Sequence, residues 1–126
     1  MRVASVPTWK FADVVVRNAV WGSNRSRFGK WVLGETLVIL VAKEGVVVAT
    51  VADKGFLSDQ MIWEDDLHEY RIPVRVEHAL RGPAGSAANL AVHKALADGL
   101  GNIYGAYIMS QNKLPEEVEL LVKKAL

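Results

Sequence analysis

Two short runs decide the fold: Thr36-Leu37-Val38-Ile39-Leu40-Val41-Ala42 and Val46-Val47-Val48-Ala49-Thr50-Val51-Ala52. Both are rich in β-branched residues, and Lys43-Glu44-Gly45 joins them. The pattern therefore predicts a β-hairpin with Gly45 at a positive-φ position of the turn. Neither run alternates apolar with polar residues, so both faces of the strands should be covered. This is typical of the wall of a small β-barrel or of a strongly curved sheet.

The segment before the hairpin predicts one strand, one helix and a loop. Residues 2–6 form a short strand that ends at a proline, and Thr8 is a suitable N-cap for a helix over 9–18. A run of three valines inside that helix also suits a strand. The polar stretch 23–30 is typical of an irregular loop.

After the hairpin, residues 70–78 alternate and predict a half-exposed strand. Its two faces would be Ile72, Val74 and Val76 on one side and Arg71, Arg75 and Glu77 on the other. Pro73 has no N–H to give to a ladder, which indicates a sheet edge or a bulge.

The last third of the chain predicts two more helices and a strand. Residues 81–85 read as a loop, Ser86 as the cap of a helix over 87–98, and residues 103–109 as a strand. A final helix opens at Leu114-Pro115-Glu116-Glu117, with proline and acidic residues in its first turn. The prediction is a single α+β domain over 1–126, a small β-barrel or strongly curved sheet with peripheral helices.

Composition excludes several classes of protein. The 126 residues carry a net charge of +1 and contain no Cys, which excludes a disulfide scaffold, a thiolate metal site and a Cys nucleophile. No apolar run approaches the ~20 residues of a membrane helix, and the start of the chain lacks a signal-peptide pattern. We therefore expect a cytoplasmic protein that does not bind membranes. The many valines, with no Cys and only two Gln, suggest a thermophilic source.

No catalytic constellation emerges. Glu64-Asp65-Asp66 with His68 could suggest a metal site, but adjacent side chains alternate in direction, and a solvated acidic loop explains the cluster better. Ser86 lies outside a Gly-x-Ser-x-Gly motif. We predict no catalytic residue, no metal and no cofactor.

The near-neutral total hides two oppositely charged segments. Residues 2–30 hold six basic residues and one acidic residue, a net charge of +5, whereas residues 53–69 carry a net charge of −5. Aromatic residues are interleaved with the basic ones, which favours nucleic-acid binding, with cations on phosphates and rings on bases.

Trp21 is the centre of the predicted site. It precedes small polar residues that leave room for a planar ligand and could bond its edge, and Trp63 could approach as a second wall. The predicted base pocket is Trp21, Gly22, Ser23, Asn24 and Trp63. The predicted phosphate-binding residues are Arg25, Arg27 and Lys30. Trp9 and Trp31 are assigned to packing.

Three stretches together resemble the EVE domain of the PUA-like superfamily, as found in small archaeal stand-alone members. They are Asn18-Ala19-Val20-Trp21-Gly22-Ser23, Gly34-Glu35-Thr36-Leu37-Val38-Ile39-Leu40 and Tyr70-Arg71-Ile72-Pro73-Val74-Arg75-Val76. Glu35 stands where the family usually has Asp, and Leu40 where it has an aromatic residue. Lys113-Leu114-Pro115-Glu116-Glu117 is similar to the family's closing helix, and residues 82–109 match nothing.

The resemblance implies a PUA-like barrel that recognises a modified base in RNA or DNA. The related YTH domain holds N6-methyladenine in an aromatic cage, and Trp21 and Trp63 match the positions of two cage walls. Trp9 and Phe28 are candidates for the third wall.

The leading hypothesis is a non-catalytic domain, monomeric or weakly dimeric, that recognises a modified or flipped-out base of nucleic acid. Two alternatives remain. One is a small amidohydrolase of the ASCH group acting on a modified nucleoside, although the motif of that group is not matched. The other is a homodimeric interaction module, in which the two charged segments pair across the dimer.

Overall fold

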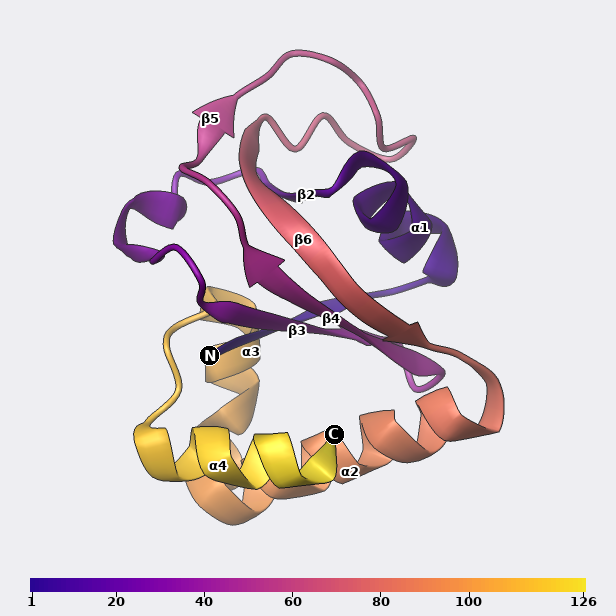
Figure 1. Cartoon of the computed structure of the whole chain (residues 1–126), viewed down its shortest axis with the longest axis vertical. Helices are drawn as coiled ribbons and strands as arrows, with labels where there is room; N and C mark the ends of the chain where they lie inside the picture. Colours follow the sequence, from indigo (N-terminus) through magenta and orange to yellow (C-terminus); the bar gives the residue numbers. More distant parts are fainter.

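The computed structural model describes all 126 residues. Its strands are β1 (Arg2–Val6), β2 (Val20–Ser23), β3 (Thr36–Val41), β4 (Gly45–Val51), β5 (Phe56–Leu57) and β6 (Tyr70–Leu80). Its helices are α1 (Trp9–Asn18), α2 (Gly82–Leu100), α3 (Tyr104–Ser110) and α4 (Glu116–Ala125), with 3₁₀ turns η1 (Phe28–Lys30) and η2 (Gly101–Ile103). The predicted α+β class is confirmed (Figure 1).

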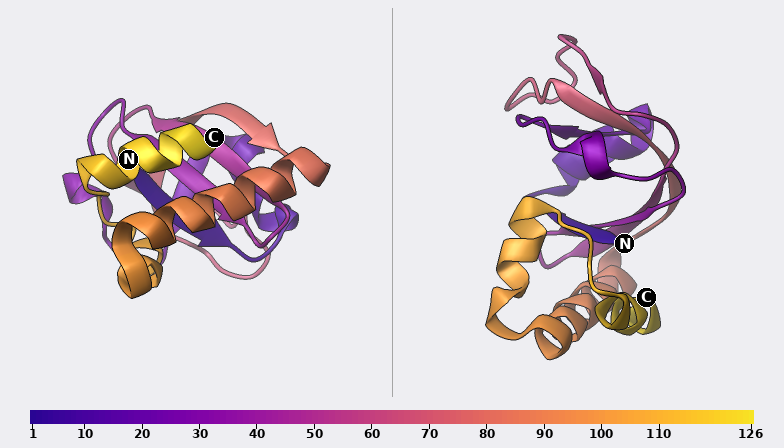
Figure 2. Two further views of the ribbon diagram at one scale, coloured as in Figure 1. Left: turned by 90° about the horizontal axis from the view of Figure 1, so that it is seen from below. Right: turned by 90° about the vertical axis from the view of Figure 1, so that its left-hand side faces the viewer.

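The strands form one strongly curled sheet, and the curved-sheet form of the prediction is the correct one. The strand order is β1-β3-β4-β6-β2, and β5 also pairs with β6. The pair β1–β3 is parallel and the other pairs are antiparallel. The sheet curls into a half-barrel, as the right-hand view of Figure 2 shows, and strands β1 and β2 are its two ends.

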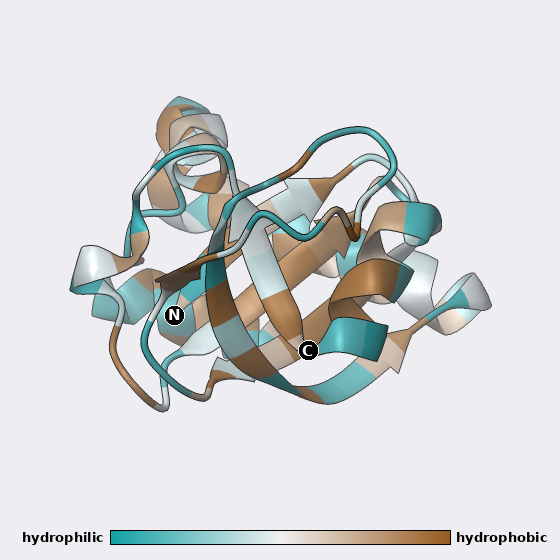
Figure 3. Ribbon diagram, turned by 90° about the horizontal axis from the view of Figure 1, so that it is seen from above, coloured by the Kyte–Doolittle hydropathy of each residue, from teal (hydrophilic) through white to brown (hydrophobic).

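Both faces of the hairpin strands are buried, which explains why their sequences do not alternate. Leu37 and Ile39 of β3 belong to a cluster inside the curl, which α1 helps to close. Val38 and Leu40 point to the other face, into a cluster shared with α2, α3 and α4. In Figure 3 the hydrophobic strands cross the middle of the molecule and hydrophilic loops lie at its rim.

The hairpin is confirmed, but the role predicted for Gly45 is wrong. The positive φ, 47°, falls on Ala42, at the other end of the turn. Gly45 is needed for close packing instead. A Cβ there would lie 2.2 Å from Cζ2 of Trp9 and 2.4 Å from the carbonyl oxygen of Leu80.

Three predictions for the last third of the chain are wrong: the loop over 81–85, the cap at Ser86 and the strand over 103–109. The stretch predicted as a strand over 103–109 is η2 and α3, because a short apolar run alone does not distinguish a strand from a buried helix face. Ser86 does not cap a helix, since α2 already begins at Gly82 with Arg81 as N-cap. Pro83 lies in the first turn, where its missing N–H costs nothing.

Strand β6 is an inner strand rather than an edge. It pairs with β4 on one side and with β2 and β5 on the other. Pro73 lies opposite Val20, where the pairing with β2 begins. The irregularity of this strand lies further along, where the register with β4 shifts between Val48 and Ala49. The prediction that Arg71 faces solvent is also wrong, since that residue is only 3% exposed.

Asn89 fastens the hairpin turn to α2. It is 2% exposed, and its Nδ2 donates to the carbonyl oxygens of Ala42 and Gly45, each at 2.9 Å. We expect Asn89→Ala to lower the free energy of unfolding by about 2 kcal/mol, because two buried carbonyls lose their donor. Denaturant titration measures this, with the exposed Asn102→Ala as control. Equal stability of the two variants would contradict the assignment.

Candidate nucleic-acid interface

Trp21 lies on β2 with its indole turned into the curl of the sheet. It is 3% exposed, and its Nε1 donates to Oε1 of Gln111 at 3.1 Å. Trp21 is therefore part of the core cluster as well as a predicted pocket wall.

Trp63 reaches the same region from the connection between β5 and β6. It is 1% exposed and packs against Gly22, where a Cβ would lie 2.5 Å from Cη2 of Trp63. Gly22 is therefore the residue that lets this indole approach β2. The two predicted walls are brought into one cluster of the fold.

Phe11 of α1 contacts both indoles. Its ring stacks on Trp63, with centroids 5.2 Å apart and planes at 24°, and meets Trp21 edge-on at 6.2 Å. His68 meets Phe11 and Trp63 edge-on, each at 5.1 Å. We call Phe11, Trp21, Trp63 and His68 the aromatic cluster. Phe11 carries no signal in the sequence beyond its place on the apolar face of a helix.

Two buried nitrogens of the aromatic cluster have no hydrogen-bond partner. They are Nε1 of Trp63 and Nε2 of His68, and the second of these lies 3.7 Å from Oδ1 of Asp65. An unpaired buried polar group costs about 1–3 kcal/mol, so the position of both calls for an explanation. His68 also has φ of 45°, which is uncommon for a residue with a side chain.

A hollow of about 370 Å³ opens beside the aromatic cluster. Its lining includes Phe11 and Trp63, polar Thr8, and the charged residues Lys10, Arg17 and Glu64. The Nζ of Lys10 lies 2.5 Å from Oε2 of Glu64. The basic and acidic segments of the sequence therefore meet here within one chain.

Arg71 holds the connection that carries Trp63 and His68. Its Nη1 donates to Ser58 Oγ at 2.8 Å, its Nη2 to the Leu67 carbonyl at 3.1 Å and also to the Gln60 carbonyl, and its Nε to the His68 carbonyl at 3.3 Å. The guanidinium also lies 5.5 Å from the ring centroid of Trp63. Burial lowers the pKa of Arg71 from its ordinary value.

The polar residues of the predicted pocket have partners within the chain. Ser23 is buried, and its Oγ accepts the N–H of Arg25 at 3.0 Å. Asn24 is exposed and donates from Nδ2 to Oδ2 of Asp66. The Leu67 N–H and then the Asn24 amide lower the pKa of Asp66. Asn24 thus links the loop after β2 to the acidic connection.

The three predicted phosphate-binding residues form no ion pair. Arg25 and Lys30 are exposed, and Arg27 donates from Nη1 to the Met109 carbonyl at 3.1 Å. Burial, and then the nearby charge of Arg25, lower the pKa of Arg27. The absence of a carboxylate partner leaves these charges available to an anion.

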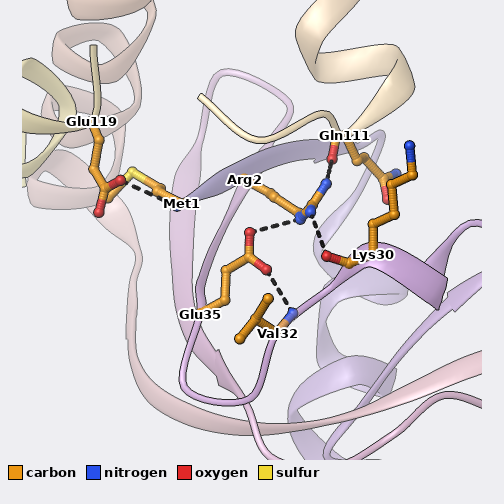
Figure 4. Close-up of polar contacts among 7 residues, drawn as sticks. All are labelled: Met1, Arg2, Lys30, Val32, Glu35, Gln111 and Glu119. Carbon is orange, nitrogen blue, oxygen red and sulfur yellow. Dashed lines mark hydrogen bonds and ion pairs between the residues drawn. The ribbon is translucent and has the colours of Figure 1, made fainter. Parts of the chain in front are cut away.

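Arg2, by contrast, is structural (Figure 4). Its Nε lies 2.7 Å from Oε1 of Glu35, and its Nη1 and Nη2 donate to the carbonyls of Gln111 and Lys30. Oε2 of Glu35 accepts the Val32 N–H at 3.0 Å. This buried pair joins β1 to the turn before β3, so Arg2 does not contribute to a basic surface.

The remaining aromatic candidates lie elsewhere. Trp9 packs against Gly45, and the guanidinium of Arg81 lies 3.9 Å from its ring centroid. Phe28 packs edge-on against Trp31 at 4.8 Å. Neither contacts Trp63 through its ring, and Phe11 takes the third position of the aromatic cluster.

The structure holds no group of three His, Cys, Asp or Glu side chains placed to bind a metal ion. None of the helices has both the length and the apolar character that spanning a membrane requires.

Comparison of the fold identifies YTH domains as similar structures. One is the YTH domain of the Zygosaccharomyces rouxii MRB1 protein in complex with N6-methyladenosine RNA, with a TM-score of 0.58 and 13% identity over 98% of this chain and 83% of that one. Another is the Pho92 YTH domain in complex with m6A, with a TM-score of 0.52 and 14% identity over 98% and 80%. No family model and no curated protein sequence matches the chain.

Proposed function

We propose that this YTH-like domain binds nucleic acid and holds one modified or flipped-out base at the aromatic cluster. The base would stack on Trp63 and meet the edge of Trp21, while Ser23 and Asn24 lie at the adjoining end of β2. Binding rather than catalysis is the proposed activity. Stacking on such rings contributes about 1–3 kcal/mol per base.

The unpaired nitrogens of the aromatic cluster carry this proposal. A base edge offers both acceptors and donors, and it would give Nε1 of Trp63 the partner that the chain does not supply. It would also give a hydrogen bond to Nε2 of His68, which lies 3.7 Å from Oδ1 of Asp65. A purely structural cluster would gain nothing from leaving these two nitrogens unsatisfied. Buried polar groups that only the ligand can satisfy are also a strong source of selectivity.

Phe11 supports the same assignment, because its ring already has the place of a stacked base. It is half-buried, stacks on Trp63 and lies at the mouth of the adjoining hollow. We propose that Phe11 covers the site in the free protein and moves aside when a base enters.

The unpaired cations supply the contact to the strand. Arg25, Arg27 and Lys30 follow β2 directly and lack carboxylate partners, so they would neutralise phosphates on either side of the held base. This part of the binding would be independent of base identity and would weaken as salt is raised.

The proposal is tested by titrating a panel of modified and unmodified single-stranded RNA and DNA oligonucleotides at two salt concentrations. N6-methyladenosine RNA is the first ligand to test, because both similar structures contain that base. We expect one modified oligonucleotide to bind more tightly than its unmodified counterpart, and we expect this preference to persist at the higher salt concentration. A panel with no preference would contradict the base site.

Trp63→Phe adds to this test, since it keeps an aromatic ring and removes the indole N–H together with part of the ring. Stability should fall by about 1–2 kcal/mol, because the smaller ring leaves a gap at a position that is 1% exposed. Affinity for the preferred oligonucleotide should fall about fivefold, the loss of one hydrogen bond. Trp9→Phe is the matched control. Equal affinities of the two variants would contradict the role of the Trp63 N–H.

A further inference from the structure

A second hollow, of about 590 Å³, lies between the loop after β2 and strand β5. Its chemistry comes from six side chains: Arg27, Phe28, Trp31, Lys54, Phe56 and Tyr70. Figure 1 shows η1 and β5 on the same side of the sheet, separated from the helices α2 and α4. None of these residues belongs to the aromatic cluster.

Aromatic rings form the walls of this hollow. Phe28 and Trp31 pack edge-on against one another and close one side. Phe56 lies on β5, is 45% exposed, and pairs with the strand position next to Tyr70. Exposed rings that face a cavity of this size provide flat surfaces on which a planar ligand can stack.

The charge of the hollow has one sign. Its lining includes Arg27 and Lys54 and no Asp or Glu. Neither cation forms an ion pair, and the one hydrogen bond of the Arg27 side chain goes from Nη1 to the Met109 carbonyl. In addition, Nε of Arg27 is buried and has no hydrogen-bond partner. Rings and unpaired cations together select a planar anion rather than a neutral or cationic ligand.

The hollow adjoins the proposed base site and shares Arg27 with its phosphate-binding residues. Ile72 lines the hollow and lies opposite Trp21 in the β2–β6 ladder. The lining of the other hollow, at Phe11 and Trp63, contains carboxylates from Glu64 and Asp65. The two hollows therefore differ in charge and would accept different parts of a ligand.

We propose that this hollow is a second nucleotide site, which takes a base together with its own phosphate and requires no modification. The base would lie against Phe56 and Tyr70, and Arg27 and Lys54 would bind the phosphate. This site does not depend on the base site at Trp63, and together the two sites would bind two nucleotides of one strand.

The test uses adenosine monophosphate as the probe and follows the amide and indole NMR signals of the whole chain. Adenosine and ribose 5-phosphate, which lack the phosphate and the base respectively, are the matched comparisons. We expect the monophosphate to shift the signals of Gly29, Gly55 and the Trp31 indole, and to bind at least about fivefold more tightly than either fragment.

Variants separate the hollow from the base site. Lys54→Gln and Phe56→Ala should each weaken binding of the monophosphate about fivefold or more. Lys94→Gln and Leu90→Ala, exposed positions on α2, should leave it unchanged. Trp63→Phe should also leave binding of the monophosphate unchanged, although it weakens binding of the modified oligonucleotide.

Three outcomes would overturn the second site. The first is equal affinity for adenosine and adenosine monophosphate. The second is a set of NMR shifts centred on Phe11 and Trp63. The third is an affinity for the monophosphate that neither Lys54→Gln nor Phe56→Ala changes. Each leaves the base site standing. Equal affinity for all the modified and unmodified oligonucleotides would contradict the base site and would not affect the second site.

Discussion

Arg71→Met is expected to lower the free energy of unfolding by about 4 kcal/mol. Arg71 is buried, and its guanidinium donates to Ser58 and to three backbone carbonyls of the connection before β6. Methionine fills a similar volume and donates nothing, so these acceptors lose a charged partner at about 1.5–3 kcal/mol each before relaxation reduces the total. Because the connection carries Trp63, indole fluorescence should shift toward that of an exposed tryptophan.

The measurement is denaturant unfolding, combined with hydrogen exchange over residues 58–68. Arg75→Met is the matched control, because Arg75 lies on the same face of β6 four residues later and is exposed. Its effect should stay within about 0.5 kcal/mol. Arg71→Lys keeps the charge but not the fork of donors, and it should fall between the two. If Arg71→Met were as stable as Arg75→Met, Arg71 would not organise the connection.

Phe11→Ala is expected to raise affinity for the preferred modified oligonucleotide about tenfold while making the protein less stable by about 2 kcal/mol. The ring of Phe11 stacks on Trp63 in the free protein, and it must leave before a base can take that face. In Phe11→Ala no free energy is needed to move a ring off Trp63 when the base binds, so affinity rises. The stacking of Phe11 on Trp63 is lost from the folded state, so stability falls. Opposite changes in stability and affinity distinguish a removable cover from a simple packing residue.

Isothermal titration and denaturant unfolding of the same samples measure the two effects. Val16→Ala, an exposed change on the same helix, should alter neither. Phe11→Trp should reduce affinity, because a larger ring covers more of Trp63. Reduced affinity in Phe11→Ala would show instead that Phe11 is a permanent wall of the site.

The sequence predicts most of the sheet because the physical signal is local there. The runs around Val38 and Val47 are rich in β-branched residues and are joined by a short turn, which favours buried strands. The alternation around Val74 indicates one covered face. Arg71 shows the limit of this reasoning. Alternation places Arg71 and Arg75 on the same face of the strand. They differ because the connection before β6 folds over Arg71 and buries it, whereas Arg75 stays exposed.

In the candidate site, too, some residues have a local signal in the sequence and others are set only by tertiary contacts. Trp21 and Trp63 are recognisable from their neighbours in the sequence, and the fold brings them into one cluster. Phe11 and His68 could not be found in this way, because their role depends on helix α1 meeting the connection before β6 in space. Arg2 looks in sequence like one more surface charge, and its burial against Glu35 depends on the parallel pairing of β1 with β3.

The central place of β6 has a consequence for the order of folding. This strand pairs with β4, β2 and β5, so the sheet cannot curl until residue 80 is available. The β3–β4 hairpin needs only its own short turn, whereas β2 must wait for a partner about fifty residues further along the chain. Closure of long loops slows folding. We expect an early hairpin nucleus, and a nascent chain whose Trp21 stays exposed until late in synthesis.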